Sequence, residues 1–395
     1  MAFTRAEVSY LVKHQEEISE AEKQVGLTSA TVIADTDYLG KRFGQFGRSV
    51  SELLRARWVG GRKGLPGDWI YPLEAAEQAT PPAVVRERQR RIRKFFPDAL
   101  VHDVTCSIGT EIATSASDEE GTNRSPFRHT PVVGSDLDIA RVACAQYNSG
   151  QPVFVADALA TTTNARVIIA DPARRSGGRR IPRPEDLLPP LPDLVAAHSG
   201  AELAFKCAPG IDYSDWDGLV SVTSVDSGVK EACLYTPGLA GGERREAIII
   251  RDGVVADRVT GAEIEPASAD DIVGEPGEFI LDPDGAIVRA GLVRNFAARE
   301  GMWMLDPRIA HLTGNAIPAG YSGFRILDDV PLKKLKKALV PYHAGSAEIL
   351  VRGVDISPDS LRKKLKLKGD TPVSIVITRI GKTAHAFICE PRQWG

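Results

Sequence analysis

The chain lacks the features of several large protein classes. It has no apolar run near the roughly 20 residues that a membrane-spanning helix needs, and no apolar secretory segment near its start. Its five cysteines are scattered without a CxxC pair, which predicts neither a disulfide framework nor a cysteine zinc site. Its seven histidines show no HxH or HExxH spacing. We therefore expect a cytoplasmic protein with reduced thiols, no membrane partner and no metal.

The chain also lacks a large excess of charge of either sign. A net charge of −3 gives no general attraction to nucleic acid, but the positive charges are unevenly placed. One basic segment spans residues 333 to 368, and a second, RERQRRIRKFF, spans residues 86 to 96. The basic residues of the first segment are Lys333, Lys334, Lys336, Lys337, Arg352, Arg362, Lys363, Lys364, Lys366 and Lys368. These segments are candidate contacts for the phosphates of RNA.

Apolar residues make up 43% of the sequence, which is enough to form ordinary hydrophobic cores. The length of 395 residues predicts more than one domain. Apolar residues at helical spacing predict an N-terminal helical domain over 1–97. We place an α/β domain at 98–260. A connector subdomain follows at 261–320, with helices expected at 284–299 and around 302–312. A small α+β module at 321–395 carries the basic helices.

The α/β domain is predicted from short apolar runs separated by helical stretches. The runs are ALVHDVT, TPVVGSD, PVFVAD, ARVIIAD, AELAFKCA, GLVSVTSV and REAIIIRDG. Runs of this length between Asp, Gly and Pro are typical of buried parallel strands, and their alternation with helices predicts a doubly wound, Rossmann-like sheet. Ligands of such sheets bind at the carboxyl ends of the strands.

Four strand ends carry residues suited to a nucleoside cofactor. In DVTCSIGTE a strand ends at Asp103 and a tight loop with Gly109 leads into a helix, so that backbone N–H groups can approach a ligand. In GSDLD a strand ends at Asp136, which can accept hydrogen bonds from a ribose. The third predicted strand, in VFVADAL, ends at Asp157. The fourth, IIADPARR, sets Asp171 before Pro172, whose rigid turn fixes the position of the carboxylate.

This ordered series resembles the motifs of the class I S-adenosylmethionine-dependent methyltransferases, over roughly residues 99 to 250. The whole layout resembles an actinobacterial branch of these enzymes with a C-terminal THUMP-like domain. The resemblance implies S-adenosylmethionine as cofactor, with the first loop at its methionine part, Asp136 and Leu137 at its ribose, and Asp157 and Ala158 at its adenine. The residues implied at the methionine part are Asp103, Thr105, Cys106, Ser107, Gly109, Thr110 and Glu111.

The DPAR tetrapeptide is similar to the D/N-P-P-[YFR] motif of methyltransferases that modify nucleic-acid bases. It implies a methyltransferase acting on a base of tRNA or rRNA, in which Asp171 and Pro172 orient the acceptor amine. The sequence departs from the motif because Ala173 replaces a proline, and Arg174 stands where an aromatic residue often stacks on the base. A guanidinium group can stack in the same way or hold a phosphate.

Three alternatives stay open. Cys207 in AFKCAPG resembles the nucleophile of enzymes that methylate carbon 5 of pyrimidines, and the neighbouring Lys206 could lower the pKa of its thiol. The substrate could instead be a protein or a small molecule. The chain could also be a non-catalytic factor that binds S-adenosylmethionine or RNA.

Overall fold

The computed structural model describes residues 3–116, 131–172, 175–176, 179–180, 183–261 and 272–395. The chain divides into two compact units. The first comprises residues 1–225 and 230–242, and the second comprises residues 226–229 and 243–395. The helical N-terminal region and the first strands of the α/β sheet belong to the same unit.

The first unit begins with helices. They are α1 (Arg5–Lys13), α2 (Gln15–Glu22), α3 (Val32–Phe43), η1 (Gly44–Phe46), α4 (Gly47–Gly61), α5 (Leu73–Gln78) and α6 (Pro82–Phe95). A capping box formed by Thr4 and Glu7 starts α1, and Pro82 starts α6. The N-terminal helices pack onto Ala140 and Cys144 of α8 (Ile139–Ser149).

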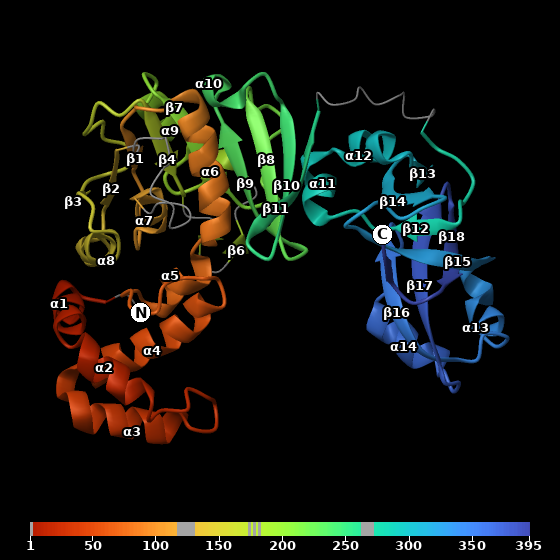
Figure 1. Ribbon diagram of the computed structural model, residues 1–395, viewed down its shortest axis with the longest axis horizontal. Helices are drawn as coiled ribbons and strands as arrows, with labels where there is room; N and C mark the ends of the chain where they lie inside the picture. The colour runs from red at the N-terminus through yellow and green to blue at the C-terminus, as the bar shows by residue number, and fades with distance from the viewer. Residues whose placement is uncertain (1–2, 117–130, 173–174, 177–178, 181–182, 262–271) are drawn as a thin grey trace. The chain divides into compact units, whose positions relative to one another are not determined.

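A twisted sheet with α6 against it follows in the same unit (Figure 1). Within this unit, the strand order of the sheet is β8-β9-β7-β4-β1-β2-β3. The strands are β1 (Val101–Asp103), β2 (Val132–Asp136), β3 (Val153–Val155), β4 (Val167–Ala170), β7 (Glu202–Cys207), β8 (Leu219–Val225) and β9 (Gly228–Tyr235), and the remaining elements are α7 (Thr110–Ala116), β5 (Arg175–Ser176), β6 (Arg179–Arg180), η2 (Pro184–Asp186), α9 (Leu191–Ala197) and α10 (Pro237–Ala240).

The order of the strands determines where a ligand can bind. Strands β3, β2, β1, β4 and β7 are parallel to one another, and β1 lies between β2 and β4. The chain therefore reverses its winding direction at β1 and β4, the place where doubly wound sheets open a crevice. The predicted Rossmann-like fold is confirmed, with the difference that β9 pairs antiparallel to β7. The sequence reading missed β9 because its first half, Gly228–Glu231, contains two charged residues.

The second unit contains a hairpin and a mixed sheet. The hairpin joins β10 (Arg245–Arg251) to β11 (Val254–Thr260). The sheet has the order β13-β14-β12-β15-β18-β17-β16, and β19 pairs with β15. Its elements are β12 (Phe279–Leu281), α11 (Gly285–Ala290), α12 (Val293–Glu300), β13 (Trp303–Asp306), β14 (Ile309–Gly314), β15 (Ser322–Pro331), η3 (Leu332–Lys334), α13 (Leu335–Ala338), β16 (Ala344–Arg352), α14 (Pro358–Leu365), β17 (Thr371–Ile380), β18 (Thr383–Cys389) and β19 (Gln393–Trp394).

The prediction of a helix around residues 302–312 is wrong. The segment forms β13 and β14, which are antiparallel partners with Met304 opposite Leu312. Met304 of β13 and Leu312 of β14 are both buried, and they lie together because they are opposite each other on paired strands, where cross-strand neighbours pack. Because β12 pairs with β15, these strands continue the sheet of the C-terminal module.

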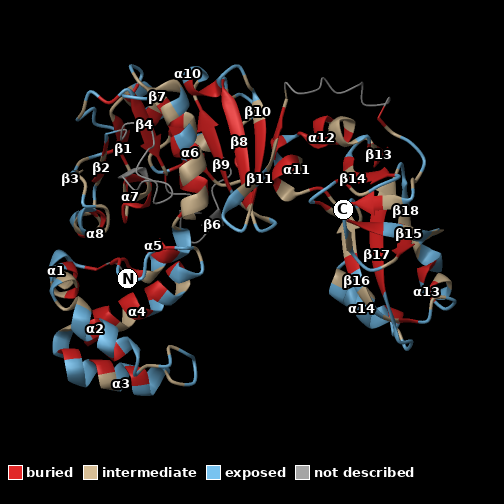
Figure 2. Cartoon of the chain, viewed as in Figure 1, coloured by how far each residue is buried: buried red, intermediate tan, exposed pale blue. Residues whose placement is uncertain are grey.

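The centre of each sheet is buried, as Figure 2 shows for the strands of both units. In the first unit Ile92 and Phe95 of α6 pack on Val167, Ile169 and Ala204. Helix α6 is therefore part of the core of the α/β unit, although the sequence places it within the helical region.

Candidate active site

The loop after β1 is connected to the end of β2 by backbone hydrogen bonds. The Ser107 N–H donates to Asp136 Oδ2 at 3.0 Å, and the Cys106 N–H donates to the Ser135 carbonyl at 2.9 Å. The Thr105 N–H donates to Asp103 Oδ1 at 3.1 Å. Two residues of this loop, Ser107 and Gly109, have positive φ. The conformation of the loop is therefore fixed by the two neighbouring carboxylates.

Gly109 is required at its position for two reasons. Its φ is 85°, and a Cβ there would lie 3.0 Å from the Cα of Ala145 in α8. Close approach of the loop to a neighbouring helix is one of the roles glycine has in cofactor loops. The single glycine of this loop thus serves helix packing as well as backbone conformation.

The ends of β2 and β3 lie next to each other, since Asp136 is the register partner of Val155. Asp136 Oδ1 accepts a hydrogen bond from the Asp138 N–H at 2.9 Å. The following Leu137 is 70% exposed. Asp157 begins a turn in which its Oδ1 accepts from the Leu159 N–H at 2.9 Å. Acidic groups and an exposed apolar side chain thus occur together at this edge.

Asp171 follows β4 and is connected to the first loop. Its N–H donates to Thr105 Oγ1 at 2.6 Å. Its carboxylate Oδ2 lies 3.0 Å from Lys206 Nζ, and its side chain is 26% exposed. Pro172 beside it is buried. Of the carboxylates in contact with Lys206, Asp171 is the more exposed, because Glu111 is 2% exposed.

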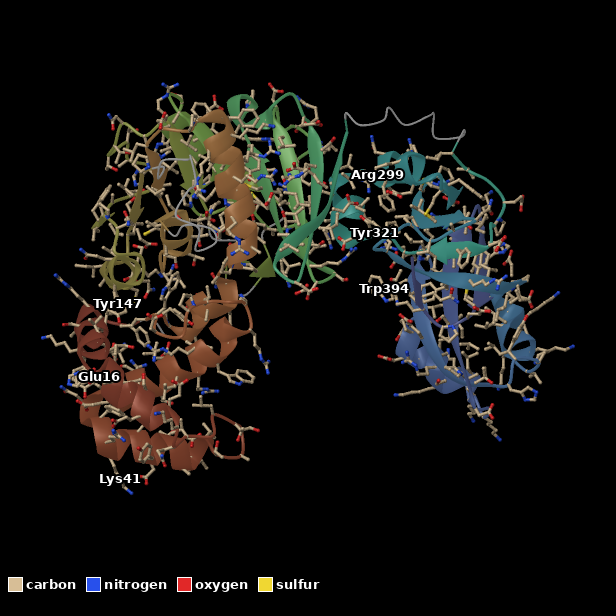
Figure 3. All side chains as sticks on the ribbon, viewed as in Figure 1. Glu16, Lys41, Tyr147, Arg299, Tyr321 and Trp394 are labelled. Carbon is tan, nitrogen blue, oxygen red and sulfur yellow. The ribbon has the colours of Figure 1, made fainter. Side chains whose placement is uncertain are left out.

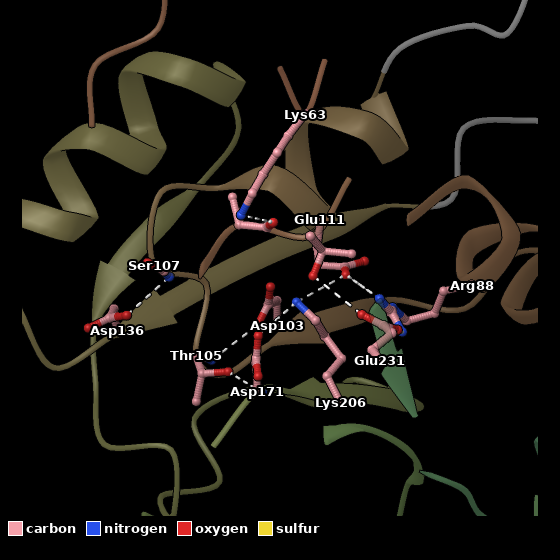
Figure 4. A network of polar contacts seen from close by, with 12 residues as sticks. Lys63, Arg88, Asp103, Thr105, Ser107, Glu111, Asp136, Asp171, Lys206 and Glu231 are labelled. Carbon is pink, nitrogen blue, oxygen red and sulfur yellow. Dashed lines mark hydrogen bonds and ion pairs between the residues drawn. The ribbon is translucent and has the colours of Figure 1, made fainter. Parts of the chain in front are cut away.

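Behind Asp171 lies a buried chain of alternating charges, shown in Figure 4. Lys206 Nζ also lies 3.5 Å from Glu111 Oε1. Arg88 Nε donates to the same oxygen at 3.0 Å, and Arg88 Nη1 donates to Glu231 Oε1 at 2.6 Å. Burial alone lowers the pKa of the Lys206 ammonium, but the carboxylates of Asp171 and Glu111 raise it above its ordinary value. Both cations therefore stay charged.

Asp103 is the titratable group of this cluster near neutral pH. Burial raises the pKa of its carboxyl to about 7, Lys206 opposes the rise, and Glu111 and Asp171 add to it. In the unfolded chain the same carboxyl has the ordinary value of 3.8. The folded state therefore holds this proton more tightly, and the contribution of Asp103 to stability is present below about pH 4 and is lost as the pH rises through 7.

This difference predicts the effect of Asp103→Asn, which keeps the Oδ1 acceptor but cannot ionise. We compare the two proteins by the difference in their free energies of unfolding, variant minus wild type. We expect this difference to be larger at pH 8 than at pH 5 by on the order of 2 kcal/mol. Urea denaturation at both pH values measures it. Asp193→Asn, at an exposed position of α9, is the control. An equal offset at both pH values would contradict the prediction.

The structure brings most of the predicted site residues to one sheet edge. Asp103, Asp136, Asp157 and Asp171 all stand at or just beyond carboxyl ends of parallel strands. Thr110 and Ala158 are buried beside them, and the Ala158 carbonyl accepts from His198 Nε2 at 2.7 Å. The predicted Arg174 lies outside the described residues. The Cys207 side chain, at the end of β7, is fully buried.

The sequence analysis missed two residues of the buried network of charges, Arg88 and Glu231. Arg88 was assigned to a basic surface run, but its side chain is 1% exposed and holds two glutamates. Glu231 lies on the unforeseen strand β9. A signal for Arg88 was present: it is separated by three and four residues from the apolar Val85, Val84 and Ile92, which face the core. Lys206 was considered only for its effect on Cys207, whereas its ammonium contacts Asp171 and Glu111.

The described residues contain no group of three or more His, Cys, Asp or Glu side chains placed to hold a metal ion. In the same residues, no helix has both the length and the apolar character to cross a bilayer. Figure 3 shows the described side chains of both units, with their nitrogen and oxygen atoms marked by colour.

Comparison with known proteins identifies the class of this fold. Its structure is similar over 99% of both chains to a "putative methyltransferase" from Porphyromonas gingivalis W83, with a TM-score of 0.69 and 16% identity. In sequence, it is 41% identical over 346 residues to an "Uncharacterized S-adenosylmethionine-dependent methyltransferase" of Mycobacterium tuberculosis, found in the strains CDC 1551 and H37Rv. That match covers 82% of this chain and 90% of the relative. Residues 322–391 match the THUMP domain-like family.

The chain belongs to the S-adenosylmethionine-dependent methyltransferases, and it carries a THUMP-like module at its C-terminal end. S-adenosylmethionine is therefore its cofactor. The acidic strand ends fit this group, because the cofactor carries a sulfonium and an ammonium, and its ribose presents hydroxyl donors to carboxylates.

Proposed function

We propose that this enzyme transfers a methyl group to a base of tRNA or rRNA, and that it acts in the cytoplasm. One observation carries the choice of RNA: the THUMP-like module of a methyltransferase presents two basic helices on one face of its sheet. Leu335 and Leu339 of the α13 region and Leu365 of α14 enter the same core cluster, with Ile375 and Ile388 of the sheet. Both helices therefore cover the same side.

The exposed basic residues of this face are named here the basic face. They are Lys333, Lys334, Lys336, Lys337, Arg362, Lys363 and Lys364. Lys and Arg side chains contact phosphates without reading sequence, so such a face supplies affinity and orientation. The specificity for one nucleotide would then come from the methyltransferase unit.

In this proposal the cofactor lies along the carboxyl edge of β1, β2 and β3. The loop from Asp103 to Glu111 contacts its methionine part, Asp136 accepts from the ribose hydroxyls, and Leu137, Asp157 and Ala158 surround the adenine. The exposure of Leu137 supports an apolar contact at this edge. The cofactor supplies a methyl group that is already electrophilic, so the task of the protein is to align the acceptor.

The acceptor is aligned by Asp171 and Pro172. The Asp171 carboxylate accepts a hydrogen bond from an exocyclic amine and keeps the lone pair of the nitrogen directed at the methyl carbon. Its partial exposure and its bond to Thr105 support this role, because it is both reachable and fixed to the cofactor loop. The burial of the Cys207 side chain favours this route over a thiol that attacks a pyrimidine ring.

Comparison of modified nucleosides tests the reaction. RNA from cells with and without the gene is digested and analysed by mass spectrometry. We expect one methylated nucleoside to be lost in the deletion strain and regained when the purified enzyme and S-adenosylmethionine are added to its RNA. An unchanged nucleoside profile, together with cofactor binding by calorimetry, would contradict an RNA substrate and favour a protein or small molecule.

The basic face gives a separate prediction about binding. Reversing three charges, Lys336→Glu, Lys363→Glu and Lys364→Glu, should weaken binding to total tRNA and reduce the slope of log affinity against log salt by about 2. Filter binding at several salt concentrations measures both. Lys41→Glu, on the exposed side of α3, is the control. An unchanged slope in the triple variant would place the RNA contacts elsewhere.

A further inference from the structure

We propose that Lys206 is a positioning residue that holds the Asp171 carboxylate in place through the buried chain of charges reaching back to helix α6. This inference rests on the proposed role of Asp171 in aligning the acceptor. It assigns Lys206 to the methyl-transfer reaction by way of Asp171, without contact to the methyl group.

The geometry around Lys206 supports this role. Its Nζ lies 3.0 Å from Asp171 Oδ2 and 3.5 Å from Glu111 Oε1, and its side chain is 8% exposed. An ammonium group buried to this degree, between two carboxylates, has little freedom to reorient. It therefore fixes the position of the Asp171 oxygen that it binds.

The helices and strands that contribute to this network of buried charges explain why Lys206 itself is fixed. Glu111 comes from α7, and it is held by Arg88 of α6, which also binds Glu231 of β9. Gln89 Nε2 donates to Glu111 Oε2 at 3.5 Å. Helices α6 and α7, strands β7 and β9, and the turn after β4 thus meet through one network (Figure 4). Among the described residues that form its ion pairs, Asp171 has the most exposed side chain, and its backbone binds the cofactor loop.

Charge balance gives the second part of the argument. Among the described residues, the charged groups around Asp171 include Lys206 from β7, Glu111 from α7 and Asp103 from β1, with Arg88 and Glu231 further along the network. Without Lys206, the carboxyls of Asp171, Glu111 and Asp103 would lose a cation that acts on all three. Loss of the shared cation favours the protonated form of each carboxyl that it contacts, and this acts on Asp171 as well as on Asp103. A protonated Asp171 cannot accept a hydrogen bond from the amine through that oxygen.

The test compares Lys206→Met with Lys206→Arg in the full-length protein. Carbon-13 NMR of aspartate-labelled protein follows the Asp171 carboxyl, whose signal is assigned by its loss in Asp171→Asn. We expect the titration midpoint of Asp171 to rise in Lys206→Met by at least about one pH unit, and to return toward the wild-type position in Lys206→Arg. Lys41→Met, which breaks an exposed pair with Asp37, is the matched control.

Methyl transfer to total RNA from the deletion strain provides the second readout. For Lys206→Met we expect the acidic limb of the kcat profile to move upward by the same one pH unit or more as the Asp171 midpoint, so that kcat on that limb falls about tenfold and recovers at higher pH, with unchanged affinity for S-adenosylmethionine in calorimetry. Circular dichroism and the urea midpoint identify a variant that fails to fold. If Lys206→Met does not fold, Lys206→Gln, which also removes the cation, takes its place: a positioning role predicts a raised Asp171 midpoint and a shifted pH profile, and unshifted ones would overturn it.

The two readouts separate this inference from the proposed substrate. If the wild type methylates no RNA but the Asp171 midpoint rises in Lys206→Met, the RNA substrate is wrong and the role of Lys206 stands. If the midpoint of Asp171 is the same in the wild type and in Lys206→Met, the inference is overturned, whatever the substrate is.

Discussion

Replacing Asp171 with alanine should reduce methyl transfer by about 100-fold or more while leaving the affinity for S-adenosylmethionine nearly unchanged. The reason is that the carboxylate stands at the acceptor side of the site, and its connection to the cofactor loop uses the backbone N–H, which alanine retains. Single-turnover transfer from labelled S-adenosylmethionine to RNA from the deletion strain measures the rate, and calorimetry measures the affinity.

Two further variants test the interpretation of this result. Asp171→Asn keeps the shape of the side chain and one acceptor oxygen, so its activity should lie between the wild type and Asp171→Ala. Cys207→Ala should retain activity, because the buried thiol has no part in amine methylation. Full activity in Asp171→Ala, or its complete loss in Cys207→Ala alone, would contradict alignment by Asp171 and favour the thiol route.

Replacing Arg88 with methionine should have the largest effect on stability, a decrease of about 3–5 kcal/mol in the free energy of unfolding. Methionine fills a similar volume but leaves Glu111 and Glu231 buried without the guanidinium between them. The loss of one partner of a buried ion pair costs far more than the pair itself contributes, because the remaining charges have left water. Urea denaturation at pH 7 measures the change.

Arg90 provides the matched control on the same helix. Its pair with Glu87 is exposed, with 70% of the Arg90 side chain accessible to solvent, so Arg90→Met should change stability by less than about 1 kcal/mol. Equal effects of the two substitutions would show that the buried network contributes no more than a surface ion pair. The double variant Arg88→Met with Glu231→Gln should recover part of the lost stability, since it removes one uncompensated carboxylate.

The sequence predicted the Rossmann-like sheet because its strands are continuous apolar runs that end at acidic residues. Burial on both faces leaves such runs with no alternation, and the Asp at the end of each run marks the strand end. The same pattern predicted four site residues at strand ends, which are, in chain order, Asp103, Asp136, Asp157 and Asp171. The small α+β module was predicted in the same way, since its strands and basic helices each have their own periodicity, whereas its THUMP-like character was implied by the resemblance.

The sequence could not identify pairs formed by residues far apart in the chain. Arg88 and Glu231 are separated by 143 positions, and their contact follows from the packing of α6 against the sheet. The helix expected around residues 302–312 failed for a related reason: the strand pairing of Met304 with Leu312 is decided by neighbouring chain segments, and local propensity is a weak guide in such cases.

The sequence by itself determined the Rossmann-like sheet and the order of the acidic strand ends, because these depend on local runs of residues and the turns between them. The class of protein and the cofactor were implied by the resemblance of those ordered motifs to a known family. Only the tertiary structure decided which charges share a buried site. The electrostatic state of Asp103, Lys206 and Asp171 depends on distances between side chains from several elements, and these distances exist only after the sheet, α6 and α7 have packed together.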